Sequence, residues 1–361
     1  MNNVLVTGGA GFIGSNFIHF LLTERSQVNI INLDLLTYSG NPMNLEGLTN
    51  TKRYSFVHGD ICDVELVNSI FESHKIDTVV HFAAETHVDR SIKNPLKFIQ
   101  TNVNGTATLL NAAVDYCKKN HSEPLKQFHF HHISTDEVYG SLEKDKPAFS
   151  ENTPFAPNSP YAASKAASDL LVRAYHKTYH IPITITNCSN NYGPYQFPEK
   201  LIPLMIHNAI NGKPLPVYGD GNQIRDWLYV NDHCSAILSV IESGHIGETY
   251  NIGGNNQPTN LEIIHSICEI LDELLPDSAF IPHLKLIQHV ADRPGHDRRY
   301  AINNDKIQSQ LGWRPKENLK SGLFKTIRWY LENPQWLANV INRSEYHEWI
   351  ESNYKNRGEI K

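Results

Sequence analysis

Near its start the chain reads Thr7-Gly8-Gly9-Ala10-Gly11-Phe12-Ile13-Gly14, directly after the apolar run Val4-Leu5-Val6 and before a helical pattern of apolar residues. The glycines fit the spacing Gly-x-Gly-x-x-Gly between a strand and a helix, which is typical of dinucleotide-binding units. Glycine permits the tight turn, the close approach of the backbone to a pyrophosphate and the packing of helix on strand, while the free N–H groups of the helix N-terminus face the phosphates. The stretch predicts a dinucleotide site.

An acidic residue stands where such a site needs one. The second expected strand, residues 28–33, ends at Asp34, about 20 residues after Gly14, which is the spacing at which an acid bonds the ribose 2′-hydroxyl. A carboxylate at this position would repel a 2′-phosphate, so we expect NAD rather than NADP. The alternative is an exposed aspartate in a loop.

Strands and helices alternate along the first half of the chain. We expect further strands at residues 54–57, 78–82, 128–133 and 181–186, and a long helix over 95–119. This order predicts an α/β fold, a Rossmann-type doubly wound parallel sheet. After Cys188, proline, glycine and aromatic residues become more frequent, which predicts a smaller, mixed α/β C-terminal substrate domain. The expected domains are residues 1–188, to which the chain returns around 228–255, and residues 189–361.

Composition narrows the class of protein. The 361 residues are 40% hydrophobic and 19% charged, with a formal net charge of -6 and scattered basic residues, which argues against nucleic-acid binding. The five cysteines have no Cys-x-x-Cys spacing, as expected for reduced thiols in the cytoplasm. A strand-like start leaves no room for a signal peptide, and no apolar run approaches the ~18 residues of a membrane span. His129, His131 and His132 are expected to pack in a strand rather than to bind a metal.

Two pairs of residues carry candidate chemistry. Asp136 and Glu137 follow the expected strand 128–133, and ligands bind at the ends of strands in open parallel sheets. Adjacent acids with separated pKa values serve as acid and base, although these residues alone fit a solvated turn better. Tyr161 and Lys165 share a helix face, where an ammonium near the hydroxyl would lower the pKa of the tyrosine. The catalytic interpretation of both pairs becomes stronger when a dinucleotide site lies in the same chain.

The motifs together resemble the extended short-chain dehydrogenase/reductase family, and within it the dTDP-glucose 4,6-dehydratases. The more specific likeness lies in Ser134-Thr135-Asp136-Glu137-Val138-Tyr139-Gly140, in residues 187–195, in residues 197–204 and in residues 292–296. It extends over essentially the whole chain. The resemblance implies a lyase that converts dTDP-glucose to dTDP-4-keto-6-deoxyglucose and water for dTDP-rhamnose or related deoxysugar synthesis, with NAD reduced and reoxidised in each turnover.

The resemblance also implies how the catalytic residues divide the reaction. Tyr161, assisted by Lys165, takes the O4 proton as a hydride leaves C4. Glu137 removes the C5 proton, which the C4 ketone has made acidic, and protonated Asp136 supplies the proton that leaves with the C6 hydroxyl. Thr135 holds O4 by a hydrogen bond. Like charges side by side make one ionised and one neutral carboxyl plausible.

Further binding residues follow from the same resemblance. The NAD site is expected to comprise Gly8, Gly11, Phe12, Ile13, Gly14, Asp34, Leu35, Thr37, Asp60, Ile61, Phe82, Ala83, Ala84, Thr101, Tyr161, Lys165 and Asn191. The substrate site is expected to comprise Thr86, Thr135, Asn190, Lys200, Leu201, Pro216, Val217, Tyr218, Arg225, Asn260, Asp292, Arg293, His296 and Tyr354. Arg225 and Arg293 are expected at the diphosphate, because guanidinium groups bind phosphate oxygens in a bidentate manner.

Several alternatives stay open at this point. The family is usually a homodimer that pairs the helix of residues 95–119 and the Tyr161 helix with their mates. A UDP-glucose 4,6-dehydratase shares the same reacting groups, and nothing in the sequence separates thymine from uracil. A 4-epimerase needs only the tyrosine, so the acid pair argues against it. A catalytically silent NAD-binding scaffold would need none of these groups.

Overall fold

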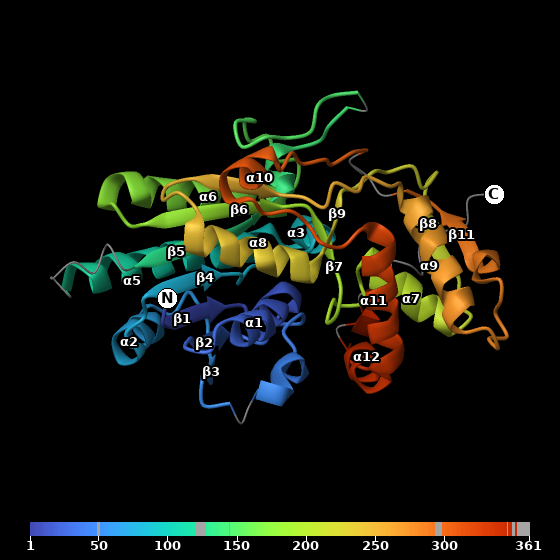
Figure 1. Ribbon diagram of the computed structural model, residues 1–361, viewed down its shortest axis with the longest axis horizontal. Coiled ribbons are helices and arrows are strands. Elements are labelled where there is room, and N and C mark those ends of the chain that lie inside the picture. Colours follow the sequence, from blue (N-terminus) through green and yellow to red (C-terminus); the bar gives the residue numbers. More distant parts are fainter. Residues whose placement is uncertain are drawn as a thin grey trace.

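The centre of the fold is a sheet of seven parallel strands in the order β10-β6-β5-β4-β1-β2-β3 (Figure 1). The computed structural model describes residues 1–48, 51–119, 128–143, 145–292, 298–344, 346–348 and 351. The doubly wound parallel sheet expected from the sequence is confirmed. Its strands are β1 (Asn3–Thr7), β2 (Asn29–Asp34), β3 (Tyr54–His58), β4 (Thr78–His81), β5 (His129–Thr135), β6 (Ile183–Cys188) and β10 (Thr249–Ile252).

Helices cover both faces of this sheet, because successive side chains of a strand point to opposite faces. Val4 and Val6 of β1 pack in one apolar cluster with α1 (Phe12–Glu24) and α8 (Val230–Ser243). Leu5 packs in another, with α2 (Val64–His74) and α5 (Thr106–Lys119). The near-continuous burial of β1 and β2 is what a sheet covered on both faces requires.

The helical segment before β5 is not a regular α-helix in its middle. The sequence predicts one helix over 95–119, whereas the chain forms α4 (Pro95–Phe98), the π-helical η2 (Ile99–Gly105) and α5. Asn102 lies inside η2, and its amide exchanges hydrogen bonds of 2.8 and 3.0 Å with the backbone of Glu85. Asn102 also donates to Ser164 Oγ at 2.8 Å. The wider turn therefore coincides with an attachment to the loop after β4.

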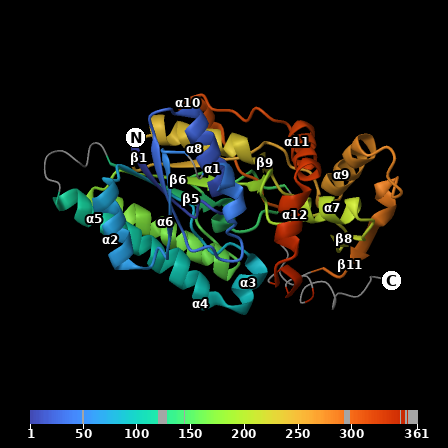
Figure 2. The same cartoon turned by 90° about the horizontal axis from the view of Figure 1, so that it is seen from below.

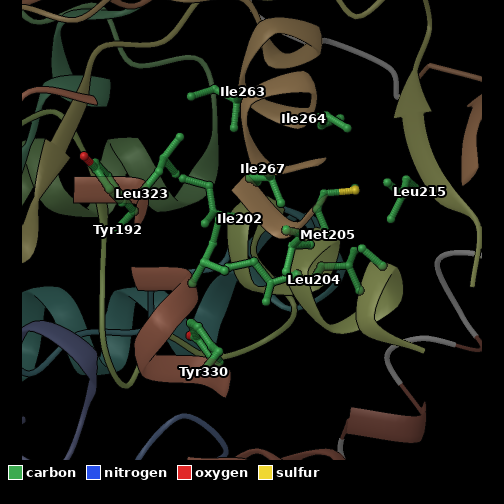
Figure 3. Close-up of a cluster of buried hydrophobic side chains, with 14 of the residues drawn as sticks. Tyr192, Ile202, Leu204, Met205, Leu215, Ile263, Ile264, Ile267, Leu323 and Tyr330 are labelled. Atoms are coloured by element: carbon green, nitrogen blue, oxygen red, sulfur yellow. The ribbon is translucent and has the colours of Figure 1, made fainter. Parts of the chain in front are cut away.

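A second group of elements lies beside the sheet. It includes β7 (Asn190–Tyr192) paired with β9 (Trp227–Tyr229), β8 (Leu215–Tyr218) paired with β11 (Ile287–Val290), and the helices α7 (Leu201–Ile210), α9 (Asn260–Leu274), α11 (Leu319–Glu332) and α12 (Pro334–Ile341). These elements share an apolar core in which Ile202 and Met205 of α7 pack with Ile263 and Ile267 of α9 (Figure 3).

The chain passes between the two groups more than once. After β9 it returns to the sheet through α8 and β10, which pairs with β6. The division into residues 1–188 and 189–361 stays a prediction. No helix in the described ranges combines the length and the apolar character needed to cross a bilayer.

Candidate active site

The carboxyl ends of the parallel strands bring the sequence motifs to one edge of the sheet. Thr7 of β1 pairs with Leu33 of β2 and with His81 of β4, and Thr135 of β5 pairs with Cys188 of β6. The glycine-rich turn and the acid pair follow two of these strand ends directly. Ligands of open α/β sheets bind at this edge, so the topology places the expected cofactor and catalytic residues together.

The glycine-rich turn is packed as closely as the motif requires. Gly8 has a φ of +71°, and a Cβ there would lie 2.6 Å from the backbone nitrogen of Ala83. A Cβ on Gly14 would lie 2.4 Å from the carbonyl oxygen of Gly8. No larger residue fits at either position without a backbone shift. The turn therefore leaves a cradle lined by backbone at the N-terminus of α1.

Asp34 closes the other side of this cradle. Its side chain is buried, and its two carboxylate oxygens accept hydrogen bonds from the backbone N–H of Ala10 at 2.9 Å and of Leu36 at 2.7 Å. Burial raises the pKa of Asp34, and these hydrogen bonds oppose that rise. The exposed loop aspartate considered as the alternative is therefore wrong.

The acid pair begins the short helix η4 (Asp136–Tyr139) and is not a solvated turn. Asp136 is only 2% exposed. Its Oδ1 accepts a hydrogen bond from Thr135 Oγ1 at 3.4 Å, and its Oδ2 is buried without a hydrogen-bond partner among the described residues. Burial, followed by the charges of Glu137 and Asp226, raises the pKa of Asp136 well above its ordinary value. Burial in this position therefore favours the neutral form of Asp136.

Tyr161 faces the same residues from α6 (Pro160–Tyr179). The helix starts at Pro160 because Ser159 caps it, with its Oγ accepting from the N–H of Ala162 at 3.1 Å, and proline suits a first helical position. Tyr161 lies close enough to Thr135, Glu137 and Asp136 for each of them to act on its pKa. Tyr161 and the acid pair therefore lie near one another at the end of β5.

The effect expected of Lys165 on Tyr161 is not what the structure shows. The pKa of Tyr161 is raised well above its ordinary value, first by burial and then by the charge of Glu137. The Lys165 ammonium instead donates to the carbonyl oxygen of Ile133 at 2.8 Å and lies 3.4 Å from His132 Nε2. Burial lowers the pKa of Lys165 to about 8. In the protein without cofactor or substrate, desolvation and the nearby acids raise the pKa of Tyr161 by more than Lys165 could lower it.

Arg225 is buried beside the acid pair. Its positive charge acts on Asp136, and its guanidinium lies over the ring of Tyr300, with 4.5 Å from Cζ to the ring centroid. Arg225 Nη1 also donates to the carbonyl oxygen of Ile224 at 2.8 Å. An arginine that is both buried and held against a ring is better suited to a fixed ligand than to a surface ion pair.

The other predicted residues fall into three groups. Gly11, Phe12, Ile13, Leu35, Thr37, Asp60, Ile61, Phe82, Ala83, Ala84 and Thr86 lie in or next to the loops that follow β1 to β4. Lys200 and Leu201 begin α7, Pro216 to Tyr218 form β8, Asn260 begins α9 and Asp292 follows β11. Arg293, His296 and Tyr354 lie outside the described residues.

Three further predicted residues lie in η2 and β7, and the side chain of one of them, Asn191, is fixed by polar contacts. Thr101 lies in the π-helical η2. Asn190 and Asn191 begin β7, and Asn191 donates to the carbonyl oxygen of Ser189 at 3.0 Å and lies 2.9 Å from His233 Nδ1. His233 had no signal of its own in the sequence.

Two buried carboxyl groups at the site were not anticipated. Asp226 follows Arg225, and burial raises its pKa to about 7. Asp169 lies on α6, fully buried, with its pKa raised to about 6 by burial. The sequence does contain a signal for Asp169, since residues 161, 165 and 169 recur at the helical spacing of four. Nothing local predicts that the charge of Asp226 acts on Asp136.

Comparison with known proteins gives one consistent result. Residues 5–326 match the family model described as GDP-mannose 4,6 dehydratase. A dTDP-glucose 4,6-dehydratase from Shigella flexneri is 52% identical over 98% of this chain and 99% of its own length. One from Neisseria meningitidis is 53% identical over 95% of this chain and 97% of its own length.

The solved structures agree. The dTDP-glucose 4,6-dehydratase of Bacillus anthracis, in complex with NAD, has a TM-score of 0.82 and 47% identity over 94% of this chain and 100% of that one. A UDP-glucose 4-epimerase from Thermotoga maritima has a TM-score of 0.79 but only 28% identity, over 92% of this chain and 99% of that one. The chain belongs to the family of the GDP-mannose 4,6 dehydratase model and, within it, to the dTDP-glucose 4,6-dehydratases.

Proposed function

We propose that this protein uses NAD to convert dTDP-glucose to dTDP-4-keto-6-deoxyglucose and water. The observation that carries the proposal is the acid pair, in which Asp136 is buried with its pKa raised well above its ordinary value, while Glu137 adjoins it and contributes to that rise. Oxidation alone, as in a 4-epimerase, does not need these two acids. The whole-chain identity to dTDP-glucose 4,6-dehydratases supports the same activity.

The residues at the sheet edge fit NAD. The backbone of the turn at Gly11, where an added Cβ would meet only the carbonyl oxygen of Gly8, at 3.2 Å, would receive the pyrophosphate, and buried Asp34 would accept from the adenosine ribose. When bound, NAD supplies the acceptor for the C4 hydride and the donor for the hydride that C6 receives. Tyr161 would meet the nicotinamide end, because it lies on α6 near Thr135 at the end of β5, with Lys165 one helical turn further along.

The protein supplies three proton-transfer groups for the remaining chemistry. Tyr161 takes the proton from O4, and Thr135, which lies close to it, would orient it. Glu137 takes the proton from C5. Asp136 gives a proton from Oδ2, the oxygen that no hydrogen bond occupies in the described structure, to the departing C6 hydroxyl. The assignment of acid and base is supported by the burial of Asp136, because desolvation favours its neutral form.

The second group of elements would hold the nucleotide. Arg225, which is held over the ring of Tyr300, would contact the diphosphate, and Lys200 at the start of α7 would assist it. The residues of β8 and the start of α9 would surround the base. We also infer a cytoplasmic location, since the cysteines are free thiols, as in a reducing compartment.

A single incubation tests the activity. The protein is mixed with dTDP-glucose, or in parallel with UDP-glucose, in deuterated water, and the product is examined by NMR and mass spectrometry. We expect a 4-keto-6-deoxy sugar that carries deuterium at C5, formed faster from the dTDP sugar. A 4-epimer as product would favour an epimerase, and an unchanged sugar in both tubes would leave only a binding scaffold.

We further infer that the protein is a homodimer. Three exposed apolar side chains, Leu96 at 74%, Ile92 at 62% and Leu170 at 55%, lie on α4, on α3 (Val88–Lys93) and on α6, which gather along one side of the molecule (Figure 2). Large exposed apolar groups that gather in this way are typical of an interface, and the family expectation identifies a second copy of the chain as its occupant.

Replacing Leu96 by aspartate should break this dimer, because the charge would have to be buried without a partner. We expect the molar mass measured by light scattering to fall from that of two chains to that of one at micromolar concentration. Ile246→Asp, at an exposed apolar position after α8, is the matched control and should leave the mass unchanged. A monomeric wild type would show the inference to be wrong.

A further inference from the structure

A polar network lies buried beneath the catalytic residues. Asp169 Oδ2 accepts hydrogen bonds from Ser134 Oγ at 2.8 Å and from Asn187 Nδ2 at 3.2 Å. Asp169 Oδ1 lies 3.2 Å from His132 Nε2 but has no hydrogen-bond partner among the described residues, and the same nitrogen lies 3.4 Å from the Lys165 ammonium, which donates to it. All five side chains are buried. A histidine thus bridges the site lysine and a carboxylate that the proposed reaction does not use.

The positions of these residues follow from two periodicities. Tyr161, Lys165 and Asp169 recur every four residues and form one stripe of α6. His132 and Ser134 alternate on β5 and therefore point to the same face of the sheet, which α6 covers. The stripe carries Tyr161 at the open end of the sheet and Asp169 two turns deeper. Asp169 is thus an anchor for both elements that carry the reacting groups.

We propose that Asp169 is a positioning residue that, across His132, acts as the buried counter-ion of Lys165, and so keeps the lysine charged and directed at the reaction. The inference rests on the proposed function, because it gives this network a role in that reaction. A buried ammonium loses its hydration and is retained as a cation only where a compensating charge lies near it. Asp169 is the carboxylate that the geometry offers.

The position of His132 explains why the lysine points where it does. A neutral imidazole nitrogen either donates or accepts a hydrogen bond, so Nε2 cannot donate to Asp169 and accept from Lys165 together. The hydrogen bond at Nε2 is the one with Lys165, whereas Asp169 Oδ1 has no hydrogen-bond partner among the described residues, so Nε2 accepts from the ammonium and Asp169 acts on Lys165 through its charge. Lys165 also donates to the carbonyl oxygen of Ile133, which leaves one ammonium hydrogen for the side of Tyr161 and the cofactor.

The surrounding groups agree with this division of charge. Besides His132 and Asp169, Cys188 of β6 and His81 of β4 face Lys165, and Arg173 faces Asp169. His132 and His81 are neutral, because burial lowers the pKa of each well below its ordinary value. The charge of Asp169 raises the pKa of Lys165, against the burial that lowers it to about 8. Both charges therefore coexist between about pH 6 and pH 8.

Asp169→Asn tests the proposal, since it keeps the shape and removes the charge. Without the carboxylate the pKa of Lys165 should fall, so the alkaline limb of the kcat profile for dTDP-glucose should move to lower pH by about one unit or more. The ammonium itself is followed in the holoenzyme by carbon NMR of labelled lysine, with the Lys165 signal identified by its loss in Lys165→Met. That titration should move in the same direction and by the same amount.

Two further variants complete the test. Asp272→Asn removes a carboxylate that likewise contacts a buried histidine, His283, but in the region of α9, and should leave both titrations in place. His132→Gln should also lower the Lys165 titration, which keeps the proposal testable if Asp169→Asn does not fold. Unmoved titrations in a folded, NAD-binding Asp169→Asn or His132→Gln protein would overturn the counter-ion role. A wild-type protein that makes no product would instead contradict the proposed function. The NMR titration would still report on the interaction of Lys165 with Asp169 in that case.

Discussion

Replacing Tyr161 by phenylalanine should abolish oxidation at C4 and with it every later step. The Tyr161 hydroxyl, which lies near Thr135, is the group proposed to take the O4 proton, and its removal leaves the apolar packing of α6 on β5 intact. Loss of a positioned general base lowers a rate by about 10²- to 10⁴-fold. We expect a loss of this size both in product formation and in the single-turnover appearance of NADH absorbance after dTDP-glucose is added.

The matched control for this variant is Tyr330→Phe. Tyr330 is also fully buried, and its hydroxyl donates to the carbonyl oxygen of Gln196 at 2.6 Å in the other apolar core. Its replacement should cost about 1 kcal/mol of stability, seen as a lower melting temperature, while turnover stays near that of the wild type. Near-normal NADH formation in Tyr161→Phe would remove this residue as the base.

The parts of the site that follow from neighbours in sequence could be predicted. The glycine-rich turn, Asp34 and the pairing of Tyr161 with Lys165 on one helix face depend on spacings of a few residues or on a strand followed by a helix. The structure places each of them where those spacings imply. The periodicity of apolar residues and the composition also predict the parallel sheet, because strands that are buried on both faces and separated by helices have few other arrangements.

The parts of the site that depend on contacts between distant segments could not be predicted from the sequence. Asp136 owes its raised pKa to burial and partly to Asp226, which lies 90 residues further along the chain. Lys165 finds its acceptor on Ile133 rather than on its helical neighbour Tyr161. Spacing identifies the face on which a side chain lies, but the opposing strand and the loss of water decide which group it meets and at what pKa.

Replacing Glu137 by glutamine should separate oxidation from elimination. The amide has nearly the shape of the carboxylate but cannot take the C5 proton, so we expect the yield of 4-keto-6-deoxy product to fall by about 10²- to 10⁴-fold. Substrate should still be oxidised at C4, and NADH absorbance should therefore appear and persist. Glu151→Gln is the control, because Glu151 accepts from the backbone N–H of Asn251 outside the acid pair, and it should turn over normally.

The oxidation step should not merely survive in this variant but become easier at a given pH. The charge of Glu137 raises the pKa of Tyr161 and also that of Asp136, so its removal lowers both. A lower pKa makes the Tyr161 phenolate more accessible, and the alkaline rise of the single-turnover rate should begin at lower pH than in the wild type. A Glu137→Gln enzyme with full product yield would show that another group takes the C5 proton. One that forms no NADH would show that Glu137 is needed before elimination begins.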